Sequence, residues 1–136
     1  MQEVFNFLKK VKVNFVATVA TGSKPNLRPF GDPVLFDGKI YCLTSKDKTV
    51  YQEITANNEV CIVAMADDED HWIRIRGKLV DDSNNIEAKK AIIAEFDWAQ
   101  AAGYTLDNPD FACLYLAEVT ATIANAEGEV SAEYNF

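Results

Sequence analysis

Residues 40–64 read IYCLTSKDKTVYQEITANNEVCIVA, and the hydrophobic period changes twice within them. The apolar run at the start predicts a strand at Ile40–Leu43, and apolar residues at helical spacing predict a helix over Asp47–Asn57. A further apolar run predicts a strand at Glu59–Ala66. The stretch therefore places the start of a helix directly after the end of a strand.

Strands outnumber helices on both sides of this stretch. The expected strands are Asn14–Ala20, Asn26–Phe30, Val34–Phe36, Ile40–Leu43, Glu59–Ala66, Trp72–Val80, Ala112–Ile123 and Val130–Phe136. The expected helices are Met1–Lys10, Asp47–Asn57 and Asn84–Ala101. Because the helices do not alternate regularly with the strands, the sequence predicts a mainly β fold with flanking helices, an antiparallel barrel formed by a single domain over residues 1–136.

Local signals set several of the element ends. Asp37-Gly38 favours a tight hairpin turn between two of the strands. Asn84 and Glu87 have the spacing of a capping box at the start of the last helix, and Gly103 is placed to end it.

The chain is acidic overall, with a net charge of −8, but the charge is unevenly placed. Residues 1–48 carry a net charge of +4 and residues 49–136 carry −12, as a local anion site or a chance asymmetry would produce. The net negative charge disfavours general binding to nucleic acid or to an anionic membrane surface. No apolar run reaches the roughly 18 residues that span a bilayer, and the N-terminus lacks the order of a secretory signal, so we expect a cytoplasmic protein.

Several other chemistries find little support. Cys42, Cys61 and Cys113 are widely spaced and form no CxxC pair, which favours buried free thiols over a metal or dithiol site. His71 is the single histidine, and it is expected in a loop after the acidic run Asp67–Asp70, which lacks the spacing of a calcium loop. Neither GxGxxG nor GxxxxGK[ST] occurs, so no dinucleotide or nucleoside-triphosphate loop is predicted.

Hydroxyl groups and cations gather at the strand-to-helix boundary of residues 40–64. Thr44 and Ser45 supply hydroxyl donors, Lys46 and Lys48 supply positive charge, and the start of a helix supplies unpaired backbone N–H groups. Together these groups suit a phosphate. The alternative is that a side chain such as Ser45 merely caps the helix, or that Asp47 does so, and that the lysines are solvated.

Arg28 adds a further cation. It lies in the extended segment NLRPF, which we expect beside Ile40–Leu43, so that its guanidinium would face the same cleft. Pro29 fixes the chain and has no N–H group. The alternative is an arginine on a solvent-facing strand, paired with an acid.

The strand Trp72–Val80 alternates between two faces. We expect the arginine and lysine side chains of this strand to be solvated or to form an ion-pair network, rather than to form a subunit surface. Trp72 is equally suited to stacking on a flat ring, to the core and to an interface. One face is expected to carry Trp72, Arg74, Arg76 and Lys78, and the other Ile73, Ile75 and Leu79.

Taken in order, NLRPFG, the stretch at 40–64 and WIRIRGKL resemble the pyridoxamine 5′-phosphate oxidase-like family, most closely over Phe15–Val80. The resemblance implies a split β-barrel of the FMN-binding type and a homodimer with FMN near the subunit interface. It also implies a set of cofactor-binding residues, with Lys48 favoured for the phosphate. They are Arg28, Pro29 and Phe30 along the flavin and its tail, Thr44, Ser45, Lys46 and Lys48 at the ribityl phosphate, and Trp72, from the second subunit, near the ring.

The end of the chain departs from the family's vitamin-forming oxidases. Those enzymes have an additional C-terminal segment with tryptophan and arginines for the pyridoxal substrate, whereas this chain ends VSAEYNF. It looks more like the short branch of nitroimidazole-resistance reductases and general-stress flavoproteins. The resemblance implies an FMN-dependent oxidoreductase of small molecules such as nitroaromatics or quinones, with NADH or NADPH as transient donor. The alternatives are a flavin carrier or stress-related sensor without turnover, or a barrel that takes haem or a deazaflavin.

Overall fold

The protein is built on one antiparallel sheet that curves into an incomplete barrel. The computed structural model describes residues 1–11 and 13–136. Its strands pair in the order β2-β1-β5-β6-β7-β4-β3, and β8 pairs with β7. The strands are β1 (Asn14–Ala20), β2 (Lys24–Phe30), β3 (Val34–Phe36), β4 (Lys39–Ser45), β5 (Glu59–Met65), β6 (Trp72–Asp81), β7 (Phe111–Ala124) and β8 (Val130–Asn135).

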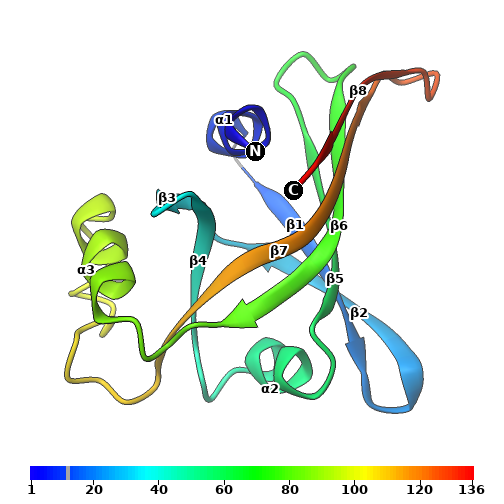
Figure 1. Cartoon of the computed structure of the whole chain (residues 1–136). Helices are drawn as coiled ribbons and strands as arrows, with labels where there is room; N and C mark the ends of the chain where they lie inside the picture. The colour runs from blue at the N-terminus through cyan, green and yellow to red at the C-terminus, as the bar shows by residue number, and fades with distance from the viewer. Residues whose placement is uncertain (12) are drawn as a thin grey trace.

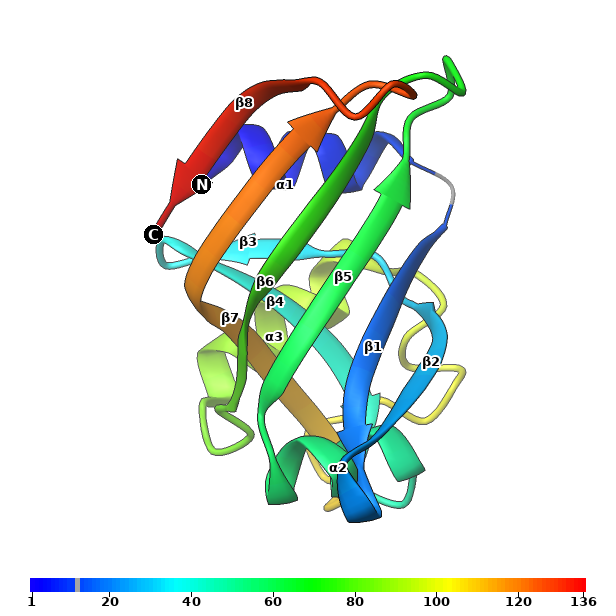
Figure 2. The same ribbon diagram turned by 90° about the vertical axis from the view of Figure 1, so that its right-hand side faces the viewer.

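Three helices surround the sheet, and they are α1 (Gln2–Lys10), α2 (Thr49–Ala56) and α3 (Ile86–Glu95). In Figure 1, α1 lies near one end of the barrel, α2 lies at the other end, and α3 stands beside β3 and β4. Figure 2 looks onto β1, β5 and β6, with β3 and β4 crossing behind them. Within the described residues, no helix is long and apolar enough to cross a membrane.

Strand β7 belongs to both halves of the barrel. Its first residues pair with β4, where Phe111 lies opposite Ser45, and its last residues pair with β8. Strand β6 pairs with β7 along nearly its whole length. The two halves are therefore joined through one long bent strand, which Figure 1 shows in orange.

The bend lies where the register of β6 against β7 shifts, between Arg76 and Lys78. At Gly77 between them, a Cβ atom would lie 2.8 Å from the carbonyl oxygen of Ala117. Opposite, Glu118 adopts a left-handed backbone with φ 51°. This conformation is rare for a residue with a side chain, so the bulge needs both a glycine on one strand and a turned residue on the other.

Two apolar clusters hold the elements together. The larger one fills the barrel with fully buried side chains such as Val16, Ile73 and Ile75, and α1 contributes Val4 and Leu8 to it. The second lies between α3 and the outer side of β3, β4 and β7. Its buried members include Tyr41, Ile92, Phe96 and Phe111.

The expected strands are present, with small shifts at their ends. Strand β2 begins at Lys24 rather than at Asn26, because only Thr21–Ser23 forms the connecting turn. The Asp37-Gly38 hairpin turn is confirmed, since both residues have positive φ. The alternation of β6 is also confirmed, because Ile73 and Ile75 are fully buried.

The prediction of a helix over Asn84–Ala101 is wrong at both ends. Asn85, not Asn84, caps α3 by accepting a hydrogen bond from the N–H of Ala88 at 3.0 Å. The helix ends at Glu95 because Phe96 takes an extended backbone and buries its ring in the second cluster. The apolar spacing that suggested a longer helix belongs instead to a turn region that covers the same cluster.

Strand β2 forms one edge of the sheet. Among the described strands its one neighbour is β1, which pairs with it from Asn14 opposite Phe30 to Ala20 opposite Lys24. Pro25 and Pro29 lie in this edge strand and have no backbone N–H to offer to a further strand.

We predict that Gly77→Ala destabilises the protein by about 1–3 kcal/mol, because the added methyl group would collide with the carbonyl oxygen of Ala117. Gly31→Ala is the control, since a Cβ there meets nothing within 4 Å. Urea unfolding of the two variants tests the prediction. Equal stabilities would contradict the view that close strand approach at Gly77 sets the bend.

Candidate functional site

The strand-to-helix boundary predicted to hold a phosphate forms a short turn between β4 and α2. Lys48 is the N-cap residue of α2 and has an extended backbone, and among the described residues no side chain caps the first turn of the helix. The alternative, in which Ser45 or Asp47 caps the helix, is therefore wrong. The first backbone N–H groups of α2 have no side-chain acceptor, which leaves them for an anion.

The four predicted phosphate-binding side chains differ in burial. Thr44 is buried, Ser45 and Lys46 are half-buried, and Lys48 is exposed. The turn itself is fixed from both sides, because the Lys46 N–H donates to the carbonyl oxygen of Asp110 at 2.8 Å and the Lys48 N–H donates to that of Ser45 at 3.0 Å. We call residues 44–48 together with the start of α2 the anion corner.

The segment between α3 and β7 also reaches the anion corner. The Lys48 ammonium lies 3.4 Å from the Tyr104 hydroxyl group. Tyr104 in turn packs edge-on against Phe111, whose backbone lies opposite Ser45. Nothing in the local sequence around Tyr104 indicated this proximity, because it depends on the path of a long connection.

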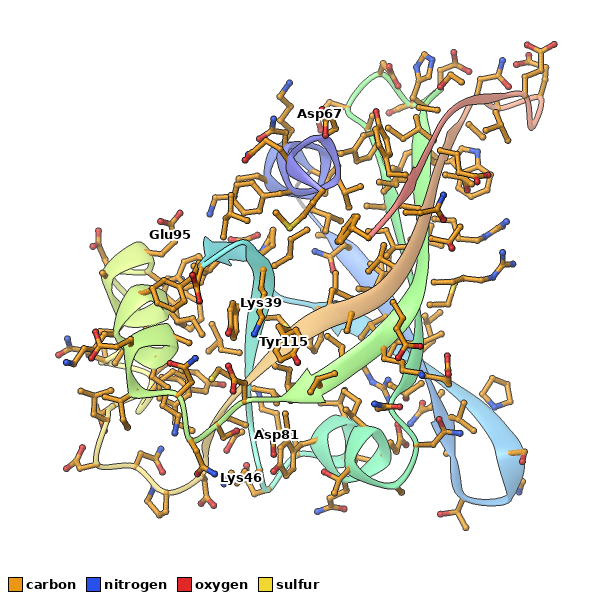
Figure 3. The ribbon with its side chains drawn as sticks, in the orientation of Figure 1. Lys39, Lys46, Asp67, Asp81, Glu95 and Tyr115 are labelled. Atoms are coloured by element: carbon orange, nitrogen blue, oxygen red, sulfur yellow. The ribbon has the colours of Figure 1, made fainter. Side chains whose placement is uncertain are left out.

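A carboxylate from the end of β6 faces the anion corner as well. Asp81 accepts hydrogen bonds from the Tyr51 hydroxyl at 2.6 Å, from the Ser83 N–H at 3.0 Å, and from the Ser83 hydroxyl. Figure 3 shows the side chains of Lys46 and Asp81 close together beside α2. Burial raises the pKa of Asp81, but these hydrogen bonds and the charge of Lys46 outweigh it, so that the pKa lies below its ordinary value.

Arg28 lies elsewhere than expected. Strand β2 does not pair with β4, because β1, β5, β6 and β7 stand between them in the sheet. The Arg28 guanidinium instead forms an ion pair with Glu53 of α2 at 2.7 Å and donates to the Thr18 hydroxyl at 2.6 Å. The alternative of an arginine paired with an acid is the one that the structure shows.

Glu53 is the centre of this second polar group. Its carboxylate also accepts hydrogen bonds from the Thr18 hydroxyl and from the Asn26 side-chain amide, the latter at 2.9 Å. The pKa of Glu53 lies below its ordinary value. The hydrogen bond from Thr18 is the largest cause of this shift, and the hydrogen bonds from Asn26 and Arg28 add to it. Within residues 1–11 and 13–136, no hydrogen bond or ion pair joins Arg28 to residues 44–48.

Trp72 lies at the other end of β6 from Asp81, and so from the anion corner of its own chain. A ten-residue strand such as β6 is roughly 30 Å long. The Trp72 ring is fixed by a hydrogen bond from its Nε1 to the carbonyl oxygen of Asn125 at 3.0 Å, and the Arg74 guanidinium lies 4.7 Å from the ring centre. One chain therefore does not bring Trp72 to the predicted phosphate-binding residues.

The outer side of β2, β1 and β5 carries an uncovered apolar surface. Phe15 is directly opposite Val63 in the sheet, and Leu27 and Met65 lie further along the same side of the neighbouring strands. Their exposed fractions are 42% for Phe15, 36% for Val63, 64% for Leu27 and 52% for Met65. We call this the apolar face, and Figure 2 shows its strands turned toward the viewer with the helices behind or below them.

The apolar face continues into a shallow hollow of about 350 Å³. Ala17, Val19 and Cys61 contribute to its lining, and Arg76 reaches it from β6. The larger groove, of about 930 Å³, lies between α3 and the segment after it, and none of the predicted site residues lines it. None of the predicted site residues lines the hollow of about 350 Å³ either.

The remaining side chains with reactive groups are the three cysteines and the histidine. Cys42 and Cys113 are buried free thiols, as expected, and Cys61 is half-buried. Burial raises the pKa of Cys113 to about 11, which keeps its thiol protonated. His71 lies in the expected loop, where its ring nitrogen is 2.8 Å from Asp68, and among the described residues no cluster of ligands suited to a metal occurs.

Comparison with known proteins agrees with this geometry. The sequence profile of the family described as "Pyridoxamine 5'-phosphate oxidase like" matches residues 1–125. The chain belongs to this family. The fold is its split barrel, a mainly antiparallel sheet with three helices, as the resemblance implied. No match was found among the curated proteins.

Solved structures extend the likeness over the whole chain. A NimC/NimA family protein from Clostridium acetobutylicum has 28% sequence identity and a TM-score of 0.90, and the alignment covers 100% of this chain and 92% of that one. A protein from the same organism related to general stress protein 26 has 17% identity and a TM-score of 0.70, over 99% of this chain and 92% of that one. A heme-binding protein from Mycobacterium smegmatis has 18% identity and a TM-score of 0.73, over 98% of this chain and 56% of that one. The last two share the fold alone.

We predict that Glu53→Gln lowers the free energy of unfolding at pH 7 by about 1–3 kcal/mol, since it removes a charged acceptor from three donors. A lowered pKa means that the carboxylate stabilises the folded state above its ordinary pKa of 4.5. That contribution is lost as the pH falls from there through the folded-state pKa. Denaturant unfolding between pH 7 and pH 3 should therefore show the two proteins converging.

Glu127→Gln is the matched control for this experiment, because Glu127 is exposed in the turn between β7 and β8. It should leave stability unchanged across the same range. If the difference in free energy of unfolding between the Glu53→Gln variant and the unaltered protein stayed constant down to pH 3, the carboxylate would not be the source of the stabilisation.

Proposed function

We propose that the protein binds FMN and holds the ribityl phosphate at the anion corner. The observation that carries this proposal is the start of α2, which has no side-chain cap and is flanked by Lys46 and Lys48. In a chain of the pyridoxamine 5′-phosphate oxidase-like family, such a helix start suits the phosphate of a flavin nucleotide.

The residues present fit a phosphate better than a neutral group. Lysine ammonium groups act as point charges for phosphate oxygens, and backbone N–H groups at a helix start donate directly. Ser45 is half-buried beside them and adds a hydroxyl donor. Thr44 is buried, so its contribution is to position the end of β4 unless the turn opens toward the ligand.

Pro29 and Phe30 stay candidates for lining the flavin, whereas the role proposed for Arg28 becomes indirect. Its guanidinium is engaged by Glu53 and by Thr18, which ties β2 to α2. In this arrangement Arg28 acts on the cofactor through the position of α2. The half-buried ring of Phe30 packs against the barrel core.

The activity that we propose is the reduction of small molecules, such as nitroaromatics or quinones, with NADH or NADPH as the electron donor. A bound flavin supplies the hydride and electron chemistry, while the protein positions it and sets its electrostatic surroundings. The likeness to a NimC/NimA family protein supports a short-chain member of this kind. The choice of substrate rests on analogy with the family.

A flavin carrier or sensor is the alternative function, and a haem-binding barrel is a second one. The fold shared with a heme-binding protein is the observation that favours the latter. The absorption spectrum of the purified protein separates flavin from haem. Steady oxidation of NADH or NADPH by the flavin-loaded protein, with an added quinone or nitroaromatic acceptor, supports the reductase, and its absence favours the carrier.

We further propose a homodimer formed through the apolar face. Four large side chains at 36% exposure or more lie on neighbouring strands there, and an exposed apolar patch of this kind often marks an interface between proteins. Trp72 and Arg74 border the patch on β6. A two-fold dimer through this face would allow Trp72 of one chain to approach the cofactor held by the other.

We predict that Lys48→Ala weakens FMN binding by about 10- to 100-fold, because one charged hydrogen bond contributes about 1.5–3 kcal/mol. Riboflavin has the same ring without the phosphate, so its affinity should not change. Lys10→Ala, on the exposed side of α1, is the control for loss of a positive charge. Fluorescence titration gives all of these affinities, and an equal loss for FMN and riboflavin would refute the phosphate assignment.

We predict that Phe15→Glu converts the dimer to a monomer, because it places a charge at the centre of the apolar face. Ile86→Glu is the control, since Ile86 is comparably exposed, at 46%, but lies on α3. Sedimentation velocity measures the outcome for both variants. A dimeric Phe15→Glu protein, or a monomeric unaltered protein, would contradict the proposed interface.

A further inference from the structure

One negative charge is fixed inside the anion corner. The Asp81 carboxylate is held by Tyr51 of α2 on one oxygen and by Ser83 on the other. Because donors from two separate segments hold it, the side chain is not free to rotate away when another anion arrives. Lys46, which we assign to the phosphate, lies close to it.

We infer that Asp81 sets the charge selectivity of the anion corner, opposing the second negative charge of a bound phosphate monoester. This inference rests on the proposed function, because it takes the corner to be the phosphate site. Lys46 and Lys48 contribute two positive charges, and Asp47 and Asp81 contribute two negative ones. The side chains of the corner therefore carry no net charge, so the second negative charge of a bound phosphate meets no surplus of positive charge.

The phosphate of FMN carries about −1.5 to −2 charges at pH 7. A fixed carboxylate beside Lys46 repels it, and the exposed position of Asp81 keeps this repulsion modest through solvent screening. Lys46 is also shared between Asp81 and the ligand. Both effects act in the same direction, so Asp81 lowers the affinity for FMN and favours exchange of the cofactor.

Asp81 differs from the other acidic groups near the corner. Asp82, the next residue, turns its carboxylate to the Tyr41 hydroxyl at 2.7 Å and to the Asn85 amide at 2.9 Å, on the side of α3. Asp110 meets the corner through its backbone carbonyl group. Asp47, within the corner, is exposed, and among the described residues no hydrogen bond or ion pair holds its carboxylate. Asp81 is thus the acid near Lys46 that the fold fixes in place.

The test is FMN titration of Asp81→Asn, which removes the charge, keeps one of the two oxygen acceptors and replaces the other by an NH2 group. We expect FMN to bind about three- to tenfold more tightly, riboflavin to bind as before, and the gain for FMN to shrink as salt is raised. Asp81→Ser is a second neutral variant that should shift FMN affinity in the same direction. Thermal unfolding confirms that each variant is folded.

Asp67→Asn is the control for the loss of one negative charge from the whole protein. Asp67 lies in the loop between β5 and β6, at the other end of β6 from Asp81, as Figure 3 shows. It should leave the affinity for FMN unchanged. Equal gains for Asp67→Asn and Asp81→Asn would assign the effect to net charge and overturn the inference.

The remaining outcomes are also decisive. If the unaltered protein binds FMN but Asp81→Asn binds it no more tightly, or more weakly, the inference is wrong while the proposed function stands. If the unaltered protein binds neither FMN nor riboflavin, the proposed function fails and the inference falls with it.

Discussion

The close approach of β6 and β7 at Gly77 is the constraint on which the rest of the structure depends. The carbonyl oxygen of Ala117 occupies the space that a side chain at position 77 would need. Because the strands can come this near, β7 bends and continues, pairing with β4 before the bend and with β8 after it. A barrel made of two halves follows from this shared strand.

The same bend determines which parts of the chain meet at the anion corner. Strand β7 carries Phe111 to the side of Ser45, and the end of β6 brings Asp81 to Tyr51 and Lys46. The basic part of the sequence, residues 1–48, therefore lies near an acid from the strongly acidic remainder. The charge asymmetry seen along the chain is partly neutralised in space, and the corner is less positive than its lysines alone suggest.

The elements and their order could be predicted from the sequence, because hydrophobic period and turn residues are local properties. Partners in space could not, since they depend on the curvature of the sheet. Arg28 is the clearest example: its strand was expected beside β4, yet it is hydrogen-bonded to β1, and Arg28 itself forms an ion pair with Glu53. The helix after Asn84 was expected to be too long for the same reason, because burial of Phe96 overrode the local helical pattern. The hydroxyls and lysines of residues 44–48 were found because they are contiguous, whereas Asp81 and Tyr104 reach them from distant segments.

The prolines of β2 bear on how copies of this protein can accumulate. An edge strand with free N–H groups invites another chain to add itself, and then another, without limit. Pro25 and Pro29 interrupt that row of donors along the border of the sheet. Open-ended self-association through this edge strand is therefore disfavoured. Concentrated solutions of the protein should resist fibril growth from this edge even though the apolar face lies next to it.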